Sequence, residues 1–371
     1  MRKKHYLSKG VICSSLILVL AASISFNSCK AKEDKPKLKY HLNLGRLSTL
    51  TQSPPVILAK EKKYFEKYGL SIDIQSLGNN TSEPLALGKI DACFQGLVKE
   101  VVMGANNEKL TFFGGTQTGG VYVGAHKDNA ELLKDPANWK GRSVGAILLS
   151  TSDLALKDYT THTLGLEIGE DVFFKQFEDK PSIAIGIGKK NIDLGLVDPE
   201  FVSVLEANGG TVIARVTDFI PDNVCCRQMA YTPHFIANRE AYIAFMKAQI
   251  LGYRDFKLDV ENSIKILSKA YGEDEDYVVT MVYDPKQNAN RGYNPDPNYN
   301  AVQGVYRTLI DLGYIDQTNA RQLWEYFDIS IYSDALKEVT AEYPDEKFFK
   351  ELREYFISHN NYYPDFEKIY Q

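Results

Sequence analysis

Residues 83–96 read EPLALGKIDACFQG, and residues 182–200 read SIAIGIGKKNIDLGLVDPE. Each stretch has a small-residue apolar segment, then Gly-Lys, then Ile-Asp before a short apolar run, and ends in polar residues. This order predicts a helix closed by glycine, a tight turn, a buried strand and a loop at the strand's carboxyl end. Open α/β sheets bind ligands at such loops. The two copies favour two α/β lobes that each supply one wall of a cleft, although helix–glycine–strand junctions occur in any α/β protein.

Further strands and helices are expected on both sides of the two copies. Alternating or apolar runs predict strands at 39–45, 70–77, 110–113, 121–125, 139–147 and 173–177. Residues 114–120, rich in glycine, are predicted to form a turn. Helices are expected at 54–65, 150–164, 238–258, 261–271, 274–282, 301–312 and 319–327, and residues 335–371 read as charged amphipathic helices.

The N-terminus has the pattern of an export signal. A basic start precedes an apolar run from Val11 to Phe26, which is short for a membrane-spanning helix. Cys29 and the charged residues after it resemble a bacterial lipoprotein cleavage site and tether, so we expect a signal peptide over 1–28, a lipidated Cys29 and a tether over 29–37. Because the residues before Cys29 depart from the usual pattern, ordinary cleavage with an unmodified cysteine stays open. The expected location is the cell envelope, on its periplasmic or cell-surface face.

The composition narrows the class of protein. The chain has 371 residues and a net charge of −5, so it lacks the basic field of a nucleic-acid-binding protein. Its 44% apolar and 25% charged residues are typical of a globular protein, and the length suits two domains. The 23 tyrosines fit a ring-binding cleft, but tyrosines scattered through core and surface are the expected explanation.

Motifs for catalysis, cofactors and metals are missing from the sequence. There is no HExxH, GxGxxG or Walker A pattern, and we expect no catalytic residues and no cofactor. The histidines are dispersed and no CxxC pair occurs, which gives no metal-ligand spacing. Cys93 is expected to be a small core residue. Cys225 and Cys226 either form a vicinal disulfide or are two strand residues that face opposite sides, and we expect the second.

Polar residues at helix starts and strand ends are the candidates for ligand binding. Ser150, Thr151 and Ser152 open a helix, where they are either N-caps or donors to an anion or polar head group. Further candidates, such as Thr49 and Gln52, precede the first helix, and others, such as Gln95 and Asp198, follow predicted strands. The candidate ligand-binding residues are Arg46, Thr49, Thr51, Gln52, Gln95, Gly96, Gln117, Ser150, Thr151, Ser152, Asp198 and Glu200.

The order of these motifs resembles a known family. Residues 45–49 read GRLST and residues 55–70 read PVILAKEKKYFEKYGL. This opening is similar to that of periplasmic substrate-binding proteins of the nitrate/sulfonate/taurine and thiamine-precursor group. Later motifs continue the resemblance over most of residues 38–340: Gly88 to Asp91, Trp139 to Gly145, Ser150 to Ser152, Asp198 to Glu200, and Cys225-Cys226 before Thr232-Pro233.

The resemblance implies a two-lobed type II periplasmic binding protein fold of class α/β, with the ligand cleft between the lobes. Lobe I would use residues 38–121 and 232–371, the latter with a C-terminal helical extension, and lobe II residues 122–231. Crossover strands near 121–125 and 227–231 would form the hinge. The family's role implies a monomer that binds a small-molecule solute, delivers it to an ABC permease and stays on the membrane through its lipid anchor.

Departures from the family pattern leave alternatives open. Where the family often has Trp-Glu-Pro, this chain has Val197-Asp198-Pro199-Glu200. The added negative charge favours a zwitterionic, amine-bearing or heterocyclic solute. An enzyme similar to thiamine-pyrimidine synthases or chorismate dehydratases stays possible, although the former have a longer cysteine cluster and a substrate histidine. A surface lipoprotein that binds a protein partner through the aromatic, acidic tail after residue 340 is the third possibility.

Overall fold

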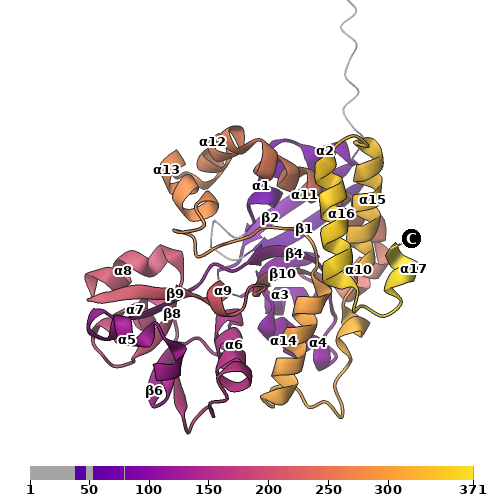
Figure 1. Cartoon of the computed structure of the whole chain (residues 1–371). Coiled ribbons are helices and arrows are strands. Elements are labelled where there is room, and N and C mark those ends of the chain that lie inside the picture. Colours follow the sequence, from indigo (N-terminus) through magenta and orange to yellow (C-terminus); the bar gives the residue numbers. More distant parts are fainter. Residues whose placement is uncertain (1–37, 47–52, 79, 371) are drawn as a thin grey trace, which may run out of the picture. The chain divides into compact units, whose positions relative to one another are not determined.

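The computed structural model describes residues 38–46, 53–78 and 80–370 (Figure 1). The expected signal peptide, the tether and Cys29 lie outside these residues. In the described part of the chain, no helix has the length and apolar character needed to cross a membrane.

The strands form two five-stranded sheets. The first sheet has the order β2-β1-β3-β10-β4. In it β1 is parallel to β2 and β3, and β10 is antiparallel to β3 and β4. Its strands are β1 (Tyr40–Arg46), β2 (Leu70–Ser76), β3 (Ala92–Gly96), β4 (Leu110–Thr118) and β10 (Val224–Tyr231).

The second sheet repeats this arrangement with the order β7-β6-β8-β5-β9. Here β6 is parallel to β7 and β8, and β5 is antiparallel to β8 and β9. Its strands are β5 (Tyr122–His126), β6 (Arg142–Ala146), β7 (Val172–Gln176), β8 (Leu194–Val197) and β9 (Gly210–Arg215). In each sheet the fourth position is held by a strand that enters directly from the other half of the fold. This exchange confirms the expected two-lobed type II architecture.

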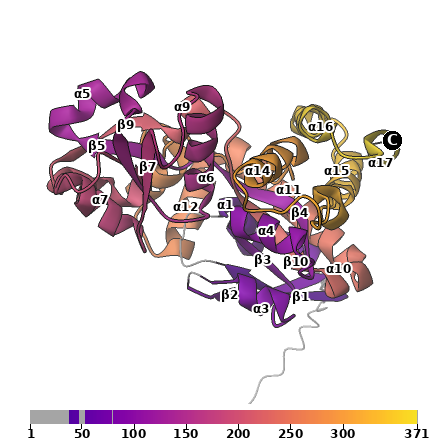
Figure 2. The same ribbon diagram turned by 90° about the horizontal axis from the view of Figure 1, so that it is seen from below.

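Helices cover both sheets, and Figure 2 shows them from a second direction. The helices that cover the first sheet or extend its lobe are α1 (Pro54–Glu61), α2 (Tyr64–Lys67), α3 (Ser82–Ala86), α4 (Val98–Ala105), α10 (Thr232–Ala237), α11 (Arg239–Leu258), α12 (Val260–Tyr271), α13 (Glu275–Val278), α14 (Tyr299–Asp311), α15 (Ser330–Glu342), α16 (Lys347–Asn360) and α17 (Phe366–Tyr370). Those with the second sheet are α5 (Ala130–Leu133), α6 (Thr151–Asp158), α7 (Lys180–Gly188), α8 (Val202–Ala207) and α9 (Val216–Phe219).

Single turns of other helix types complete the secondary structure. Helix α6 continues into the π-helical turn η4 (Tyr159–Thr163), and α13 into the π-helical turn η6 (Val279–Tyr283). The 3₁₀ turns are η2 (Lys127–Asn129), η3 (Pro136–Trp139), η5 (Pro199–Phe201) and η7 (Leu323–Tyr326). The helix predicted over 319–327 is therefore wrong: only η7 forms there. The capping contacts of Gln322 and Glu325 start that turn, and it ends at Phe327, whose backbone is extended at φ −131° and ψ 130°.

The two quoted sequence stretches form the predicted units. In the first, α3 is followed by Gly88 at φ +64° and the buried strand β3. In the second, α7 is followed by a left-handed turn at Lys190 and the fully buried strand β8. Both strands are buried and largely apolar because helices cover each face of their sheets, and Gln95 is the polar exception in β3. The carboxyl ends of β3 and β8 then present Gly96 and Asp198.

The sequence predicted a turn over the whole glycine-rich stretch 114–120, but only part of this stretch turns. Gly114 and Gly115 lie inside β4, and only Gly119 and Gly120, at φ +60° and +86°, turn the chain toward β5. Gly115 is glycine for a packing reason, because an added Cβ would lie 2.3 Å from the carbonyl oxygen of Asp296. The segment that contains Asp296 therefore passes directly against β4, beside the connection between the two sheets.

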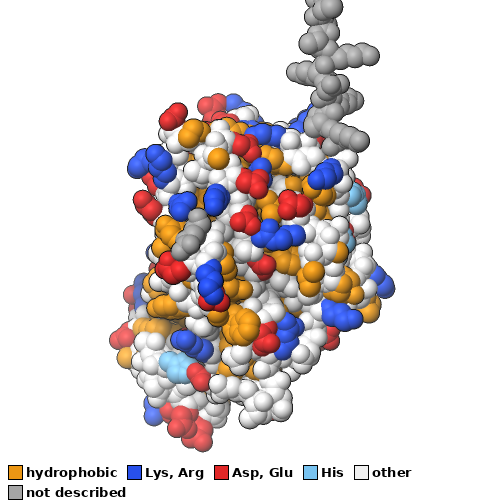
Figure 3. Space-filling view, turned by 90° about the vertical axis from the view of Figure 1, so that its right-hand side faces the viewer, with side chains coloured by type: hydrophobic (Ala, Val, Ile, Leu, Met, Phe, Trp, Pro, Cys, Tyr) orange, Lys and Arg blue, Asp and Glu red, His pale blue; other side chains and the backbone are white. Residues whose placement is uncertain are grey.

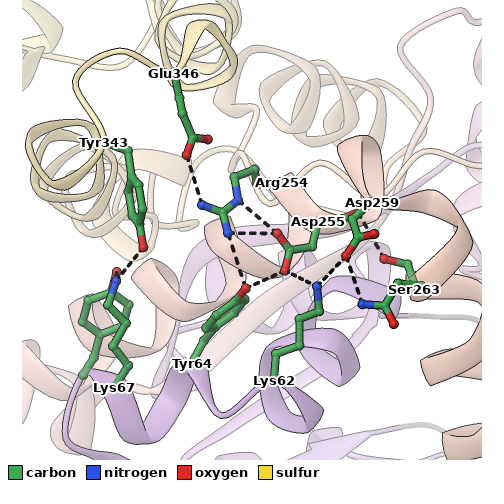
Figure 4. Close-up of polar contacts among 11 residues, drawn as sticks. Lys62, Tyr64, Lys67, Arg254, Asp255, Asp259, Ser263, Tyr343 and Glu346 are labelled. Carbon is green, nitrogen blue, oxygen red and sulfur yellow. Dashed lines mark hydrogen bonds and ion pairs between the residues drawn. The ribbon is translucent and has the colours of Figure 1, made fainter.

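Helix α11 fills the centre of the larger core. Its Tyr242, Phe245 and Met246 are fully buried, and the Phe245 ring stacks on Phe94 of β3 at 6.0 Å and on Phe65 of α2 at 5.4 Å. On the outer side of α11, a polar network joins α1, α2, α12 and the C-terminal helices (Figure 4). The face shown in Figure 3 mixes acidic and basic side chains, with no field of a single sign.

Candidate functional site

A cleft of about 220 Å³ lies where the two sheets meet. It is bordered by the carboxyl ends of β3, β4 and β8, by the first turns of α6 and α7, and by the start of β10. Its lining residues are Gly96, Gln117, Gly120, Val121, Ser150, Thr151, Ser152, Lys180, Asp198, Asn223, Cys225, Cys226 and Arg291. Among the described residues, no aromatic side chain lines it, and tyrosines such as Tyr242 and Tyr332 are instead fully buried in the core.

The three hydroxyl residues at the start of α6 have separate roles. Ser150 is the N-cap, and its Oγ accepts a hydrogen bond from the backbone N–H of Asp153 at 3.3 Å. Thr151 donates from Oγ1 to the carbonyl oxygen of Cys225 at 2.9 Å. The Oγ of Ser152 lies 3.4 Å from that of Ser150 and is 3.5 Å from the Nζ of Lys180. One hydroxyl therefore caps the helix, and all three residues line the cleft.

Lys180 was not among the residues selected from the sequence. It occupies the first turn of α7, after the N-cap Asp179, and its Nζ lies 3.3 Å from the Oδ1 of Asp198. The side chain of Lys180 is 12% exposed and that of Asp198 is 31% exposed, so the pair faces the cleft from a partly buried position. The Asp-Lys-Pro-Ser sequence at 179–182 is a helix-start signal, and it was the only hint that this lysine lies at a helix N-terminus.

Glu200 lies just beyond the cleft and is joined to Arg291, which lines it. The two side chains form a bidentate pair, with Nη1 to Oε1 and Nη2 to Oε2 both at 2.8 Å. Burial acts to lower the pKa of Arg291, but the hydrogen bonds and charge of Glu200 outweigh it and hold that pKa above its ordinary value. The two carboxylates that suggested a negative cleft, Asp198 and Glu200, are thus paired with Lys180 and Arg291. The charge of the cleft and its border is therefore close to balanced.

The first lobe supplies Gly96 and Gln117 to the cleft. A Cβ at Gly96 would lie 3.7 Å from the Oγ1 of Thr151, in ordinary van der Waals contact, so the end of β3 lies close to the start of α6. The carbonyl oxygen of Gln117 accepts a hydrogen bond from Nη1 of the buried Arg227 at 3.3 Å. Burial lowers the pKa of Arg227 from its ordinary value. This arginine holds the ends of β4 and β10 together behind the cleft wall.

Gln95 does not line the cleft. Its side chain is buried on the other side of β3, where Nε2 donates to the Oγ of Ser82 at 3.0 Å and to the carboxylate of Glu100. Ser82 also donates to Glu100 at 2.6 Å, and Thr81 donates to the amide oxygen of Gln95. The alternation of side chains along a strand explains the placement, because Gly96 and Gln95 point to opposite faces.

Glu100 in this cluster allows a prediction about pH. Burial raises its pKa to about 7, so the folded state binds a proton more tightly than the unfolded state does. Stability from this group is therefore present below the unfolded pKa and lost as the pH rises through about 7. We expect Glu100→Gln to raise the free energy of unfolding at alkaline pH, by on the order of 3 kcal/mol at most, and to change it little at acidic pH. Urea denaturation of both proteins across this range measures the difference, and a gain that is independent of pH would contradict it.

The other candidates lie away from the cleft or outside the described residues. Arg46 ends β1 beside Phe94 and is not part of the cleft lining. Thr49, Thr51 and Gln52 fall in the stretch that the structure does not describe. No group of three or more potential metal ligands gathers within the described ranges.

Cys225 and Cys226 both line the cleft, so the prediction that they face opposite sides is wrong. Their Sγ atoms lie 3.3 Å apart and both cysteines are reduced. The register of β10 against β4 shifts at Val224–Cys226 and again at Cys226–Arg227, and such a bulge breaks the alternation of side chains. The hydrogen bond between the two thiols, followed by burial, raises the pKa of Cys225 well above its ordinary value.

A second cavity of about 400 Å³ lies between α6 and α14, which run side by side (Figures 1 and 2). Its lining mixes apolar residues such as Leu154, Ile220 and Val305 with charged ones such as Asp158, Arg307 and Asp311, and it shares Thr151 and Asn223 with the cleft. It is larger than the cleft, but few of the charged and hydroxyl groups at helix starts and strand ends face it. We therefore assign the candidate binding site to the cleft.

The comparison with known families agrees with this architecture. A family model described as NMT1/THI5 like matches residues 50–257. The chain belongs to the NMT1/THI5-like family. The family resemblance expected from the ordered motifs is thereby confirmed. No curated protein sequence matches this NMT1/THI5-like chain.

Solved structures share the fold of this NMT1/THI5-like protein at low sequence identity. The periplasmic aliphatic sulphonate binding protein SsuA of Escherichia coli has a TM-score of 0.55 and 18% identity, over 76% of this chain and 92% of that one. The periplasmic nitrate-binding protein NrtA of Synechocystis PCC 6803 has a TM-score of 0.63 and 16% identity, over 80% and 88%. The desulfurization enzyme DszB has a TM-score of 0.55 and 12% identity, over 80% and 99%. The fold thus occurs in binding proteins and in an enzyme.

Proposed function

We propose that this protein is the solute-binding component of an ABC importer, anchored to the envelope through Cys29. It acts as a monomer that captures a small polar solute between two lobes and delivers the solute to a membrane permease. The lobes are residues 38–121 with 232–371, and residues 122–231, and β10 is then a crossover segment that pairs with the first lobe. The observation that carries the proposal is a polar cleft at the strand ends of both sheets, with charged groups of both signs. Membership of the NMT1/THI5-like family and the similarity to SsuA and NrtA support it.

The solute that we favour carries both an anionic and a cationic group. Lys180 and Asp198 present one charge of each sign and are paired at 3.3 Å. The first turns of α6 and α7 add backbone N–H groups that favour an anion. An acidic group of the solute would take Lys180 and the helix starts, and an amine would take Asp198. A purely anionic solute would leave Asp198 as an uncompensated charge in the cleft.

A thermal-shift screen tests the proposal. The chain from residue 30 onward would be unfolded with nitrate, alkanesulfonates, taurine, thiamine and its pyrimidine precursors, polyamines and amino acids. A ligand at 100 times its dissociation constant adds about 2.7 kcal/mol, which is a shift of a few degrees. Stoichiometric binding without turnover supports an import receptor. Turnover of a bound compound would instead support the enzyme reading, and retention of a protein from the envelope without any solute shift would support a partner-binding lipoprotein.

Asp198 provides a direct test of the solute class. We expect Asp198→Ala to weaken binding of a zwitterionic solute by roughly tenfold to a hundredfold, because the ammonium group loses its charged partner. The unfolding midpoint should change little, since Asp198 is 31% exposed and its pair with Lys180 is at the surface of the cleft. Isothermal titration calorimetry measures the affinity.

The matched control is Asp128→Ala, which removes an exposed carboxylate that pairs with Lys190 at 2.6 Å on the same lobe. It should leave solute affinity unchanged. Equal affinity of Asp198→Ala and the unaltered protein would remove Asp198 from the site.

A further inference from the structure

Cys225 and Cys226 are neighbours in the chain whose thiols also face the same space. The two Sγ atoms are 3.3 Å apart, and both residues line the cleft. Regular strand geometry would separate them, because successive side chains point to opposite faces. The bulge at the start of β10 removes that separation. The local backbone thus brings two thiols within reach of one another in the cleft wall.

The peptide between the two cysteines also joins parts of both lobes. The carbonyl oxygen of Cys225 accepts one hydrogen bond from Oγ1 of Thr151 at 2.9 Å and another from the backbone N–H of Leu97 at 3.3 Å. Thr151 belongs to the first turn of α6, and Leu97 follows β3. This one carbonyl therefore links α6 to the first sheet at the base of the cleft.

We propose that Cys225 and Cys226 are a thiol-oxidation site in the cleft wall, which closes to a vicinal disulfide on reaction with a disulfide oxidant. Cys225, the more exposed of the two, attacks one sulfur of the oxidant through its thiolate and releases the first small thiol; because the pKa of Cys225 is raised, this thiolate fraction is small and the step is faster at alkaline pH. The thiolate of Cys226 then attacks the mixed disulfide at the Cys225 sulfur and releases the second. The protein thiols lose two electrons and two protons in total, and the oxidant disulfide is reduced to two thiols. An exported protein meets such oxidants more often than a cytosolic one.

Closure of the disulfide changes the wall of the cleft. The new ring contains the peptide that joins the two cysteines, so we expect its carbonyl to turn as the Sγ–Sγ separation shortens from 3.3 Å to a bond. That rotation takes the Cys225 oxygen away from Thr151 and Leu97 together. Oxidation therefore loosens α6 where it borders the cleft, and the reduced protein is the form with the ordered wall. This consequence can be measured without knowledge of the solute.

The experiment compares the full chain with two variants, Cys226→Ser and Cys93→Ser, after treatment with oxidised glutathione in mildly alkaline buffer, where more thiolate is present. Trypsin releases both cysteines in one peptide, residues 216–227. In the unaltered protein and in Cys93→Ser, this peptide should lose two hydrogen atoms in mass. In Cys226→Ser it should instead retain a glutathione on Cys225. Phenylarsine oxide, a probe for paired thiols, should bind the reduced protein stoichiometrically and the oxidised protein not at all.

Hydrogen exchange tests whether oxidation breaks the hydrogen bond between the Leu97 amide and the Cys225 carbonyl. Exchange of the Leu97 amide should be about tenfold faster in the oxidised protein than in the reduced one, which corresponds to the loss of one hydrogen bond. Cys226→Ser treated in the same way should show no such change. A glutathione adduct or a disulfide between copies in place of the internal ring would overturn the site, and a ring that leaves Leu97 exchange unchanged would overturn its effect on the cleft.

Discussion

Replacement of Asp255 by alanine is expected to lower the free energy of unfolding by about 3–5 kcal/mol, because it leaves the partly buried Lys62 and Arg254 without the buried carboxylate that they share. The Asp255 side chain is 7% exposed and accepts from Nζ of Lys62 at 2.7 Å and from the hydroxyl of Tyr64 at 2.6 Å (Figure 4). Arg254 approaches its other oxygen at 3.0 Å. The carboxylate thus ties helix α11 to α1 and α2, which pack closely against it.

The tight packing of these helices makes compensation difficult. A Cβ at Gly252 of α11 would lie 2.1 Å from the carbonyl oxygen of Pro55, so the two helices cannot shift toward one another to cover the lost group. Burial, followed by the hydrogen bond to Asp255, raises the pKa of Tyr64 to about 12. Burial, the larger cause, remains after the substitution, so the hydroxyl stays neutral and cannot replace the missing negative charge.

Thermal and urea denaturation measure this loss, and a shift of the melting midpoint of roughly 5 °C is expected for a chain of this size. The matched control is Asp259→Ala. Asp259 also pairs with Lys62, at 2.9 Å, but it is 46% exposed, so its removal should cost less than about 1 kcal/mol. Equal destabilisation by the two substitutions would show that burial of Asp255 does not decide its contribution.

Replacement of Arg291 by methionine is expected to destabilise the fold by about 3 kcal/mol, because Glu200 then keeps a partly buried charge without its bidentate partner. The Arg291 side chain is 3% exposed and reaches Glu200 from the segment that also pairs Gly292 with Thr118 at the end of β4. This pair therefore fastens that segment to the second sheet's lobe, next to the cleft. Solute affinity should fall together with stability.

A double-mutant cycle separates the pair from other effects of Arg291. If the charge of Glu200 causes the loss, Glu200→Gln in the Arg291→Met background should restore much of the stability. The coupling free energy between the two positions should reach about 2 kcal/mol in urea denaturation. Additive losses in the double variant would mean that Arg291 acts through contacts other than Glu200.

Much of the fold followed from local patterns. Alternation or apolar runs predicted β1, β2, β3 and β8, and glycine punctuation predicted where α3 ends. The errors came from residues whose conformation depends on contacts with segments far away in the sequence. Gly115 resembles a turn residue in sequence, but its backbone lies in β4 because a distant carbonyl, that of Asp296, packs against it.

The candidate site was only partly predictable for the same reason. The start of α6, Gly96, Gln117 and Asp198 were selected because helix starts and strand ends have sequence signals, and these residues line the cleft. Lys180 and Arg291 were missed. The inference of a negative cleft therefore counted the acidic residues Asp198 and Glu200 but not their cationic partners.

The sequence by itself determined the family and the order of the two repeated units, because helix caps, glycine turns and apolar runs act between residues that are close in the chain. Tertiary structure alone decided the charge of the cleft and the position of its thiols. Glu200 and Arg291 are 91 residues apart. Their contact, like the bulge that turns Cys225 and Cys226 to one side, depends on how β10 and the segment around Arg291 pack against β4. No local pattern encodes that packing, since its energy comes from surfaces that meet only when both lobes have folded.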